Sequence, residues 1–150
     1  MKVSDILRVK GNTLFTITPD DPLSDAVNVM ADNDIGSLVV MERGELVGML
    51  TFREVILAIQ ANGGVVGSTP VRQAMDRKPL TATMDTELDE VRRMMLDRHA
   101  RYMPVMDKHM LMGVISLYDV AKAVVDSQNF ENRMLKAYIR DWPAEEEPGN

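Results

Sequence analysis

Two short segments combine a hydroxyl and a carboxylate at a spacing that could do chemistry. Thr51 precedes Glu54, and Ser116 precedes Asp119, by the same three positions, each time where an apolar run gives way to a helical pattern. One interpretation is a capping box, in which both side chains bind backbone N–H groups and close the helix end. The other is a ligand site, because a carboxylate in a first helical turn can bind both hydroxyls of a ribose, beside N–H groups that suit phosphate or sugar oxygens. The residues alone leave both interpretations open.

A cluster of basic side chains lies in the second half of the chain. Against a single acid, Asp97, the segment between positions 92 and 101 carries Arg92, Arg93, Arg98, His99 and Arg101. A guanidinium can bind two phosphate oxygens at once. Arg92 and Arg93 fit the solvated face of a helix better. Arg101, which directly precedes an apolar run, is the residue that we expect to contact a phosphate.

The sequence lacks the residue sets needed for nucleophilic catalysis, for metal binding and for a phosphate loop. The chain has no cysteine, which excludes a thiolate nucleophile and a Cys-ligated zinc ion. His99 and His109 have no partners at metal-ligand spacing, and Ser116 has no histidine base nearby in the sequence. The glycine-rich segment 63–69 lacks the Gly-Lys-Ser/Thr ending of a phosphate loop and is interpreted as a linker. We therefore expect no catalytic residues and no metal site.

Length and charge restrict the function further. The 150 residues are 45% hydrophobic and 27% charged, which is typical of one or two globular domains. A formal net charge of −6 disfavours nucleic acid polymers and anionic membranes as partners. No apolar run is long enough to span a bilayer, and the N-terminus lacks the apolar stretch of a signal peptide. We expect a soluble, cytoplasmic protein that binds neither nucleic acid nor membrane.

The elements that must position these residues occur twice. Thr16–Ala58 aligns without a gap with Thr81–Ala123, and this alignment superimposes the two hydroxyl-carboxylate pairs. Identical residues include Thr16 and Thr81, Asp20 and Asp85, Leu23 and Leu88, Met30 and Met95, Val40 and Val105, Gly48 and Gly113, and Val55 and Val120. Similarity at a fixed period indicates a duplicated unit, and two small units can bury their apolar faces by pairing.

Each copy predicts the order strand, helix, strand, strand, helix. A short strand leads to a helix that begins at a good N-cap residue, Asp21 in copy one and Thr86 in copy two. Two apolar runs then form a hairpin, and a second helix follows. The expected strands are Leu14–Thr18, Ser37–Met41 and Leu46–Leu50 in copy one, and Leu80–Thr83, Tyr102–Met106 and Leu111–Ile115 in copy two. Short helical segments lead into the copies at Val3–Leu7 and Val71–Met75.

These patterns predict the α/β (α+β) class, with two βαββα repeats packed in pseudo-two-fold symmetry and a C-terminal helix. We expect repeat 1 at 1–62, a linker at 63–70, repeat 2 at 71–126, the C-terminal helix at 127–142 and a flexible acidic tail at 143–150. The apolar residues of the C-terminal helix recur at helical spacing: Phe130, Met134, Leu135, Tyr138, Ile139 and Trp142.

The doubled unit, with the sequence Gly-Val-Ile-Ser-Leu-Tyr-Asp at 113–119 closing the second hairpin, resembles a tandem CBS domain pair, or Bateman module, of the small stand-alone bacterial type. The resemblance covers about residues 3–126. It implies an adenosine-ligand sensor without catalysis of its own. The ligand implied is an adenine nucleotide, most often AMP, ADP or ATP, and in some members NAD or S-adenosylmethionine.

Carried over to this sequence, the family pattern implies two clefts between the repeats. In the first, Asp119 holds the ribose diol, Ser116 supports the sugar or phosphate, and Val114 packs on the adenine. These residues are expected to face Asn12, Thr13, Leu14, Phe15, Ile35, Gly36 and Ser37. The second cleft uses Met49, Thr51 and Glu54, facing Pro79, Leu80, Thr81, Ala100, Arg101 and Tyr102. Glu54 stands where the family usually has Asp, which makes the second cleft the less complete match.

The resemblance favours a regulatory module that binds an adenosine nucleotide and changes conformation for a regulated protein, as a homodimer of two such pairs. The alternative is a ligand-independent dimerisation or interaction module that acts through the terminal helix. The capping-box interpretation of Ser116 and Asp119 favours this alternative. A small enzyme is a third possibility, which lacks a nucleophile-base pair or metal set in the sequence.

Overall fold

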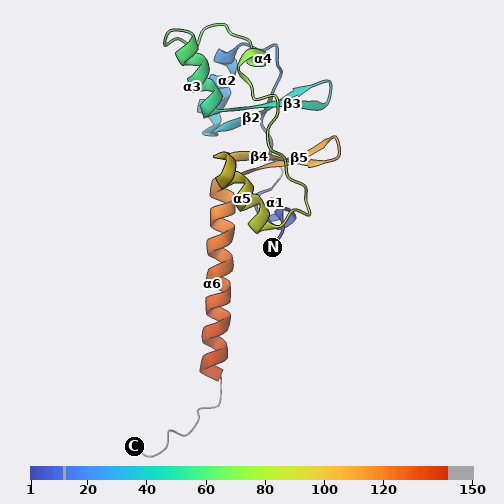
Figure 1. Cartoon of the computed structure of the whole chain (residues 1–150), viewed down its shortest axis with the longest axis vertical. Helices are drawn as coiled ribbons and strands as arrows, with labels where there is room; N and C mark the ends of the chain where they lie inside the picture. The colour runs from blue at the N-terminus through green and yellow to red at the C-terminus, as the bar shows by residue number, and fades with distance from the viewer. Residues whose placement is uncertain (12, 142–150) are drawn as a thin grey trace, which may run out of the picture.

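The computed structural model describes residues 1–11 and 13–141 of the chain. In chain order its elements are α1 (Val3–Lys10), β1 (Thr16–Ile17), α2 (Leu23–Asn33), β2 (Ser37–Glu42), β3 (Glu45–Thr51), α3 (Phe52–Ala61), α4 (Val71–Ala74), α5 (Leu88–Arg98), β4 (Tyr102–Asp107), β5 (Met110–Ser116) and α6 (Leu117–Asp141). Figure 1 shows two lobes stacked along the long axis, with α6 projecting below the second lobe. The predicted mixed class with two repeats is confirmed.

Each lobe is built on a small sheet. In the first, β1 runs parallel to β2 and β2 runs antiparallel to β3. In the second, β4 pairs antiparallel with β5, and the strand predicted at Leu80–Thr83 is reduced to a parallel bridge between Ala82 and Val105. Equivalent residues hold equivalent register positions: Gly48 lies opposite Val40, and Gly113 lies opposite Val105. The sequence duplication is therefore a structural duplication.

The short lead-in helices are exchanged between the repeats. Val71 and Met75, which precede copy two in the sequence, belong to the core of the first lobe. Val3, Ile6 and Leu7, which precede copy one, belong to the core of the second. The first lobe is therefore one continuous stretch of chain that ends with α4, whereas the second lobe combines α1 with residues that follow the connection between the repeats.

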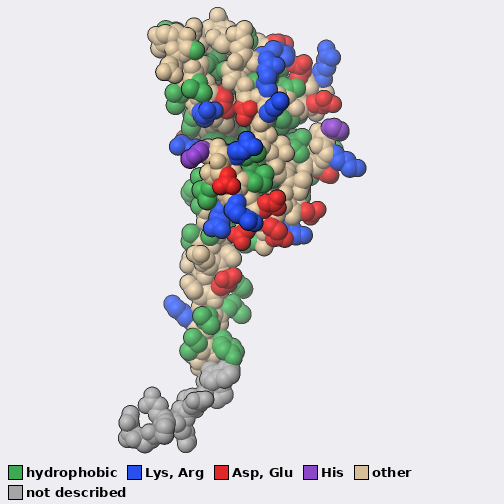
Figure 2. Space-filling model, viewed as in Figure 1, with side chains coloured by type: hydrophobic (Ala, Val, Ile, Leu, Met, Phe, Trp, Pro, Cys, Tyr) green, Lys and Arg blue, Asp and Glu red, His purple; other side chains and the backbone are tan. Residues whose placement is uncertain are grey.

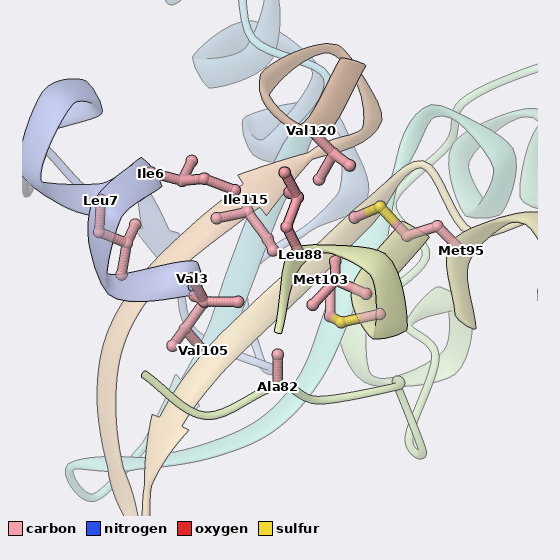
Figure 3. Close-up of a cluster of buried hydrophobic side chains, with 11 residues drawn as sticks. Val3, Ile6, Leu7, Ala82, Leu88, Met95, Met103, Val105, Ile115 and Val120 are labelled. Carbon is pink, nitrogen blue, oxygen red and sulfur yellow. The ribbon is translucent and has the colours of Figure 1, made fainter. Parts of the chain in front are cut away.

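Hydrogen bonds and packing hold α1 on the second lobe. The Val3 N–H donates to Thr86 O and the Ser4 N–H to Met84 O, both at 3.0 Å. Figure 3 shows Val3, Ile6 and Leu7 projecting from α1 among Val105, Ile115 and the other core side chains. Val3 is fully buried, which stabilises the fold by about 1.5–3 kcal/mol relative to an exposed position.

The helices α2 and α5 begin later than predicted. Their N-cap positions are held by Pro22 and Glu87, so Asp21 and Thr86 lie one residue before the caps. The side chains of Asp21 and Thr86 accept hydrogen bonds from the backbone N–H three residues earlier, at 3.1 Å and 2.9 Å. These residues therefore close the turn that precedes each helix.

Residues predicted to form two separate helices form one. The helix α6 has 25 residues and runs without interruption from the end of β5 through Asp141. Trp142 and the predicted tail at 143–150 lie outside the described residues. Within residues 1–11 and 13–141, no helix is long and apolar enough to cross a membrane.

Candidate functional site

A cavity of about 650 Å³ lies between the two repeats. Repeat 1 contributes the segment before β1 and the turn between α2 and β2, while repeat 2 contributes the start of β4, the end of β5 and the first turn of α6. Its lining residues are Lys10, Thr13, Leu14, Phe15, Asp34, Ile35, Gly36, Ser37, Val39, Arg101, Tyr102, Val114, Ser116, Leu117, Tyr118 and Ala121. A volume of this size is within the range of small-molecule sites.

Ser116 and Asp119 form a complete capping box at the N-terminus of α6. The Ser116 N–H donates to Asp119 Oδ2 at 2.8 Å, and the Asp119 N–H donates to Ser116 Oγ at 3.0 Å. The two backbone N–H groups need these side-chain partners, because N–H groups at the start of a helix have no partner within the helix. The structure thus shows the capping interpretation directly, and the Ser116 member of the pair also lines the cavity.

Lys10 joins α1 to this carboxylate. Its ammonium donates to Asp119 Oδ2 at 2.6 Å and to the Val114 carbonyl oxygen at 2.8 Å. The Lys10 side chain is 36% exposed and that of Asp119 17%. Asp119 does not itself line the cavity, but its two side-chain partners, Lys10 and Ser116, do. The packing of α1 on the second lobe therefore puts a cation beside the predicted ribose-binding acid.

The starts of β2 and β4 both line the cavity, and they approach each other where Tyr102 packs against Gly36. The Phe52 N–H donates to Gly36 O at 3.2 Å, and the equivalent Leu117 N–H donates to Arg101 O at 2.8 Å. A Cβ atom added to Gly36 would overlap the hydroxyl of Tyr102, whose ring crosses the glycine backbone. Position 36 therefore requires glycine for close packing between the repeats.

The structure brings most residues predicted for the first cleft together. Eight of the residues expected there line the cavity: Thr13, Leu14, Phe15, Ile35, Gly36, Ser37, Val114 and Ser116. Asn12 lies outside the described residues. Arg101 and Tyr102, expected in the second cleft, line this same cavity instead, because the pseudo-two-fold packing brings both strand starts to one place.

The residues predicted for the second cleft do not form one site with each other. Glu54 lines a different hollow of about 380 Å³ between α3 and α4, whose other residues are Leu57, Ala58, Ala61, Asn62, Thr69, Gln73 and Ala74. Met49 is 2% exposed, and Leu80 packs against the core of the second lobe. Pro79 and Ala100 are half-buried and Thr81 is exposed, and none of the three lines either hollow.

A backbone bridge explains why the two repeats differ here. The segment that connects the repeats crosses β3, where Met49 N–H donates to Asp76 O at 2.9 Å and Asp76 N–H donates to Met49 O at 2.8 Å. In the alignment, Met49 corresponds to Val114, whose carbonyl accepts from the Lys10 side chain instead. A side chain can leave a carbonyl more easily than a paired backbone segment can, so the two repeats differ in how easily the carbonyl at this position can be freed.

Glu54 is also engaged within its own repeat. The Thr51 hydroxyl lies 3.1 Å and 3.0 Å from the two carboxylate oxygens, and it accepts from the Arg53 N–H at 3.2 Å. Burial raises the pKa of Glu54, and the charge of Asp76 raises it further, while the Thr51 hydroxyl lowers it. Glu54 is 8% exposed, so the carboxylate acts as a buried helix cap.

Sequence reasoning missed six lining residues: Lys10, Asp34, Val39, Leu117, Tyr118 and Ala121. Leu117, Tyr118 and Ala121 surround the Ser116–Asp119 pair on α6, so their place follows once that pair is taken as the site. Asp34 is the left-handed C-cap of α2, equivalent to His99 on α5. No feature of the sequence indicates that Lys10 lines the cavity, because it reaches the cavity only through the packing of α1 on the second lobe.

Two cations and one acid stand on the cavity wall: Lys10, Arg101 and Asp34. Asp119 adds a second acid just behind Lys10. Among the described residues, no group of three or more His, Asp or Glu side chains could hold a metal ion. The arrangement suits an organic ligand with hydroxyls for the acids and an anionic group for the cations.

Residues 3–61 and 71–126 each match the sequence model of the CBS domain. The chain belongs to the CBS domain family. The two CBS segments contain both lobes, and the cavity lies between them. The C-terminal part of α6 continues beyond the second segment.

Two relatives illustrate the range of the family. The CBS domain-containing protein CBSX3, mitochondrial, of Arabidopsis thaliana is 33% identical over 147 residues, covering 92% of this chain and 71% of the relative. The CBS domain-containing protein YhcV of Bacillus subtilis is 30% identical over 106 residues, covering 71% of this chain and 75% of the relative. Both are similar over most of their own length.

Solved structures share the fold. The CBS domain structure of NE2398 has a TM-score of 0.79 and 29% identity, covering 83% of this chain and 98% of that one. The CBS domain pair of MJ0100, in complex with 5-methylthioadenosine and S-adenosyl-L-methionine, has a TM-score of 0.75 and 22% identity, with 85% and 98% covered. CBSX2 in complex with AMP has a TM-score of 0.71 and 22% identity, with 85% and 98% covered. At 22% identity the last two show the fold alone.

Proposed function

We propose that this CBS pair is a regulatory module that binds one adenosine nucleotide in the cavity between its repeats. The observation that carries the proposal is the grouping of Asp119, Ser116 and Lys10 at one end of a 650 Å³ cavity that also holds Arg101. A carboxylate can accept both hydroxyls of a ribose, and two cations can bind a phosphate. A nucleotide presents a diol and a phosphate together, and its base offers a flat surface to the apolar side chains of Phe15, Ile35 and Val114 in the same cavity.

The proposed orientation follows from the chemistry of the wall. The ribose diol donates to Asp119, and the adenine packs against Val114 and the apolar side of the cavity formed by Phe15 and Ile35. Lys10 then exchanges the carboxylate for the phosphate, together with Arg101. This orientation assigns roles to residues from both repeats, so that the bound ligand favours one relative arrangement of the lobes.

AMP is the ligand that we propose first, with ADP, ATP, NAD and S-adenosylmethionine as competitors. The complexes of CBSX2 with AMP, and of the MJ0100 pair with 5-methylthioadenosine and S-adenosyl-L-methionine, support an adenosine group in this fold. Lys10 and Arg101 favour a phosphate over the uncharged 5-methylthioadenosine and the cationic S-adenosylmethionine. The module is proposed to have no catalytic step of its own and to act through a regulated protein.

A ligand-independent interaction module remains the second candidate, and one observation favours it. The capping box is complete and Lys10 has two partners without any ligand, so the structure does not require a nucleotide to satisfy these groups. The exposed apolar side chains of α3 and α6 would then be the functional surface, with two copies forming a homodimer.

Calorimetric titration with AMP, ATP, NAD and S-adenosylmethionine tests the proposal. We expect AMP to bind, and Asp119→Asn to weaken it about 10-fold or more, since a charge-assisted hydrogen bond contributes about 1.5–3 kcal/mol. Asn retains an acceptor for the Ser116 N–H, so the helix cap survives. Asp97→Asn, on the exposed face of α5, is the matched control and leaves the affinity unchanged. Absence of binding by the unaltered chain at millimolar ligand would favour the second candidate.

A further inference from the structure

The outer part of α6 exposes more apolar surface than a solvated helix needs. Beyond the second lobe, five large side chains are 57–64% exposed: Phe130, Met134, Leu135, Tyr138 and Ile139. Figure 2 shows hydrophobic side chains, in green, on the projecting part of the helix, below the charged surface of the body. At about 1.5 Å of rise per residue, the 25 residues extend about 37 Å. Helices derive most of their stability from packing an apolar face. Leu135 and Ile139 lie on the face of α6 that stays exposed back to its first turn, and this face is the one considered for pairing.

One face of α6 has the spacing of a coiled coil along its whole length. Exposed residues alternate at steps of three and four, and we call this set the outer stripe: Tyr118, Ala121, Val125, Gln128, Asn132, Leu135 and Ile139. A repeat of this kind keeps one narrow face toward a partner helix over many turns. Its large apolar members are 52–75% exposed, so nothing in the described chain covers them.

We propose that the outer stripe pairs in parallel with the α6 helix of a second copy of this chain. The opposite stripe cannot serve along the full length, because Val120 and Val124 on it already pack into the second lobe. The outer stripe stays exposed from the first turn of α6 onward and carries large apolar side chains, so a partner helix can lie against all of it.

Charge supports a second copy and the parallel direction. With Tyr118, Val125, Asn132 and Ile139 at the first core position of successive heptads, Glu131 and Lys136 flank the stripe on opposite sides. In a parallel in-register pair, Glu131 of one copy lies beside Lys136 of the other, twice by symmetry, and the two charges attract. In an antiparallel pair, flanking positions on the same side of the stripe face each other, so Glu131 of one copy does not lie beside Lys136 of the other.

Asn132 supports the same register. A single polar residue at a first core position fixes the register and the two-stranded state of parallel coiled coils, because it must find its own counterpart to be hydrogen-bonded. Asn132 lies between Val125 and Leu135, near the middle of the exposed part of the helix. Two copies in register would place both Asn132 amides in one layer.

The pairing surface reaches the cavity. Tyr118 and Ala121, the first two residues of the outer stripe, also line the cavity between the repeats. A second copy would therefore lie next to the cavity mouth. The pairing itself does not depend on the nucleotide proposal, since it rests on the exposed stripe and its charges.

The first test is the mass of the nucleotide-free chain in solution, by light scattering and sedimentation. We expect a dimer, and we expect Leu135→Lys with Ile139→Lys to make it a monomer. Phe130→Lys with Met134→Lys is the matched control, because these residues are equally exposed on the same helix but lie outside the outer stripe. Thermal unfolding monitors whether the lobes of each variant remain folded. A monomeric unaltered chain, or dissociation by the control and not by the stripe variant, would overturn the proposal.

The second test addresses direction and register. The chain has no cysteine, so Asn132→Cys introduces a single thiol that should oxidise to a linked dimer, while Arg133→Cys should not. Lys136→Glu should raise the dissociation constant severalfold by placing like charges together, and adding Glu131→Lys should restore it. Cross-linking through position 133 in preference to 132, or failure of the charge exchange to restore pairing, would refute the parallel register.

Discussion

Lys10 is the residue whose replacement tests most directly how the cavity would select its ligand. Its ammonium occupies Asp119 Oδ2 and the Val114 carbonyl, at 2.6 Å and 2.8 Å, where the proposed ribose must bind. A ligand with a ribose but no phosphate must displace this ammonium without giving it a new partner. A ligand with a phosphate supplies one. Lys10→Met removes the ammonium and keeps an unbranched side chain of similar length.

The magnitude follows from these two contacts. A hydrogen bond to a charged group contributes about 1.5–3 kcal/mol. The Lys10 side chain is 36% exposed, so water replaces part of the loss and the lower end applies. Displacing the Lys10 ammonium therefore costs a ribose without a phosphate about 1.4 kcal/mol, which corresponds to a factor of ten in affinity. In the Met variant, adenosine should therefore bind about 10-fold tighter. The affinity for AMP should change little, because AMP no longer has to displace the Lys10 ammonium but also loses the contact of that ammonium with its phosphate.

Calorimetric titrations of adenosine and AMP against the unaltered chain, Lys10→Met and Lys10→Arg measure this preference. The preference for AMP should fall about 10-fold in the Met variant and persist in the Arg variant, which keeps the charge. Lys78→Met, on the exposed connection between the repeats, is the control. Equal changes in the two affinities would refute the role of Lys10, whereas no binding of either ligand to the unaltered chain would refute the nucleotide proposal itself.

Three further predictions concern the fold and the cavity. Leu7→Ala should lower the free energy of unfolding by about 2–4 kcal/mol, measured in urea, whereas Val9→Ala on the same helix should change it by less than about 0.5 kcal/mol, because Leu7 is 4% and Val9 83% exposed. The raised pKa of Glu54 means that the folded chain binds its proton more tightly than the unfolded chain, so this contribution to stability is present below the ordinary pKa of 4.5 and is lost as pH rises through the raised value. Glu54→Gln, compared by urea unfolding at several pH values, should therefore gain stability relative to the unaltered chain as pH rises, and parallel curves would contradict the shift. Gly36→Ala should displace the Tyr102 ring into the cavity and weaken AMP binding in calorimetry, with Tyr102→Leu restoring part of it; unchanged affinity would contradict this packing.

The exchange of α1 and α4 has a consequence for folding. Each lobe needs a helix that precedes the other repeat in the sequence, with Val3 and Val71 both fully buried. Arg72 of α4 is held on the first lobe by Glu42 at 2.6 Å and by Asp20 at 3.3 Å. A fragment that ends before α4 would lack Val71 and Met75 of the first core, and a fragment that begins after α1 would lack Val3, Ile6 and Leu7 of the second core.

Local features of the chain are predictable from the sequence alone. The duplication, the two hairpins and the hydroxyl-carboxylate pairs depend on residues close together in the chain, whose spacing fixes which face each side chain takes. For this reason the spacing of Ser116 and Asp119 is enough to predict both a helix start and a candidate site. The helical spacing of the apolar residues after 126 is equally visible, though not the uninterrupted course of α6.

Other features depend on packing between distant segments. No local preference determines which lobe α1 joins, and that choice alone brings Lys10 to Asp119 across 109 positions of sequence. The same holds for the pairing of Asp76 with Met49, which makes the two repeats unequal although their motifs are alike. The sequence therefore determined the repeats and their two candidate acids, while the tertiary structure decided which acid meets Lys10 beside the cavity between the repeats, because burial and long-range hydrogen bonding act between residues that the sequence keeps far apart.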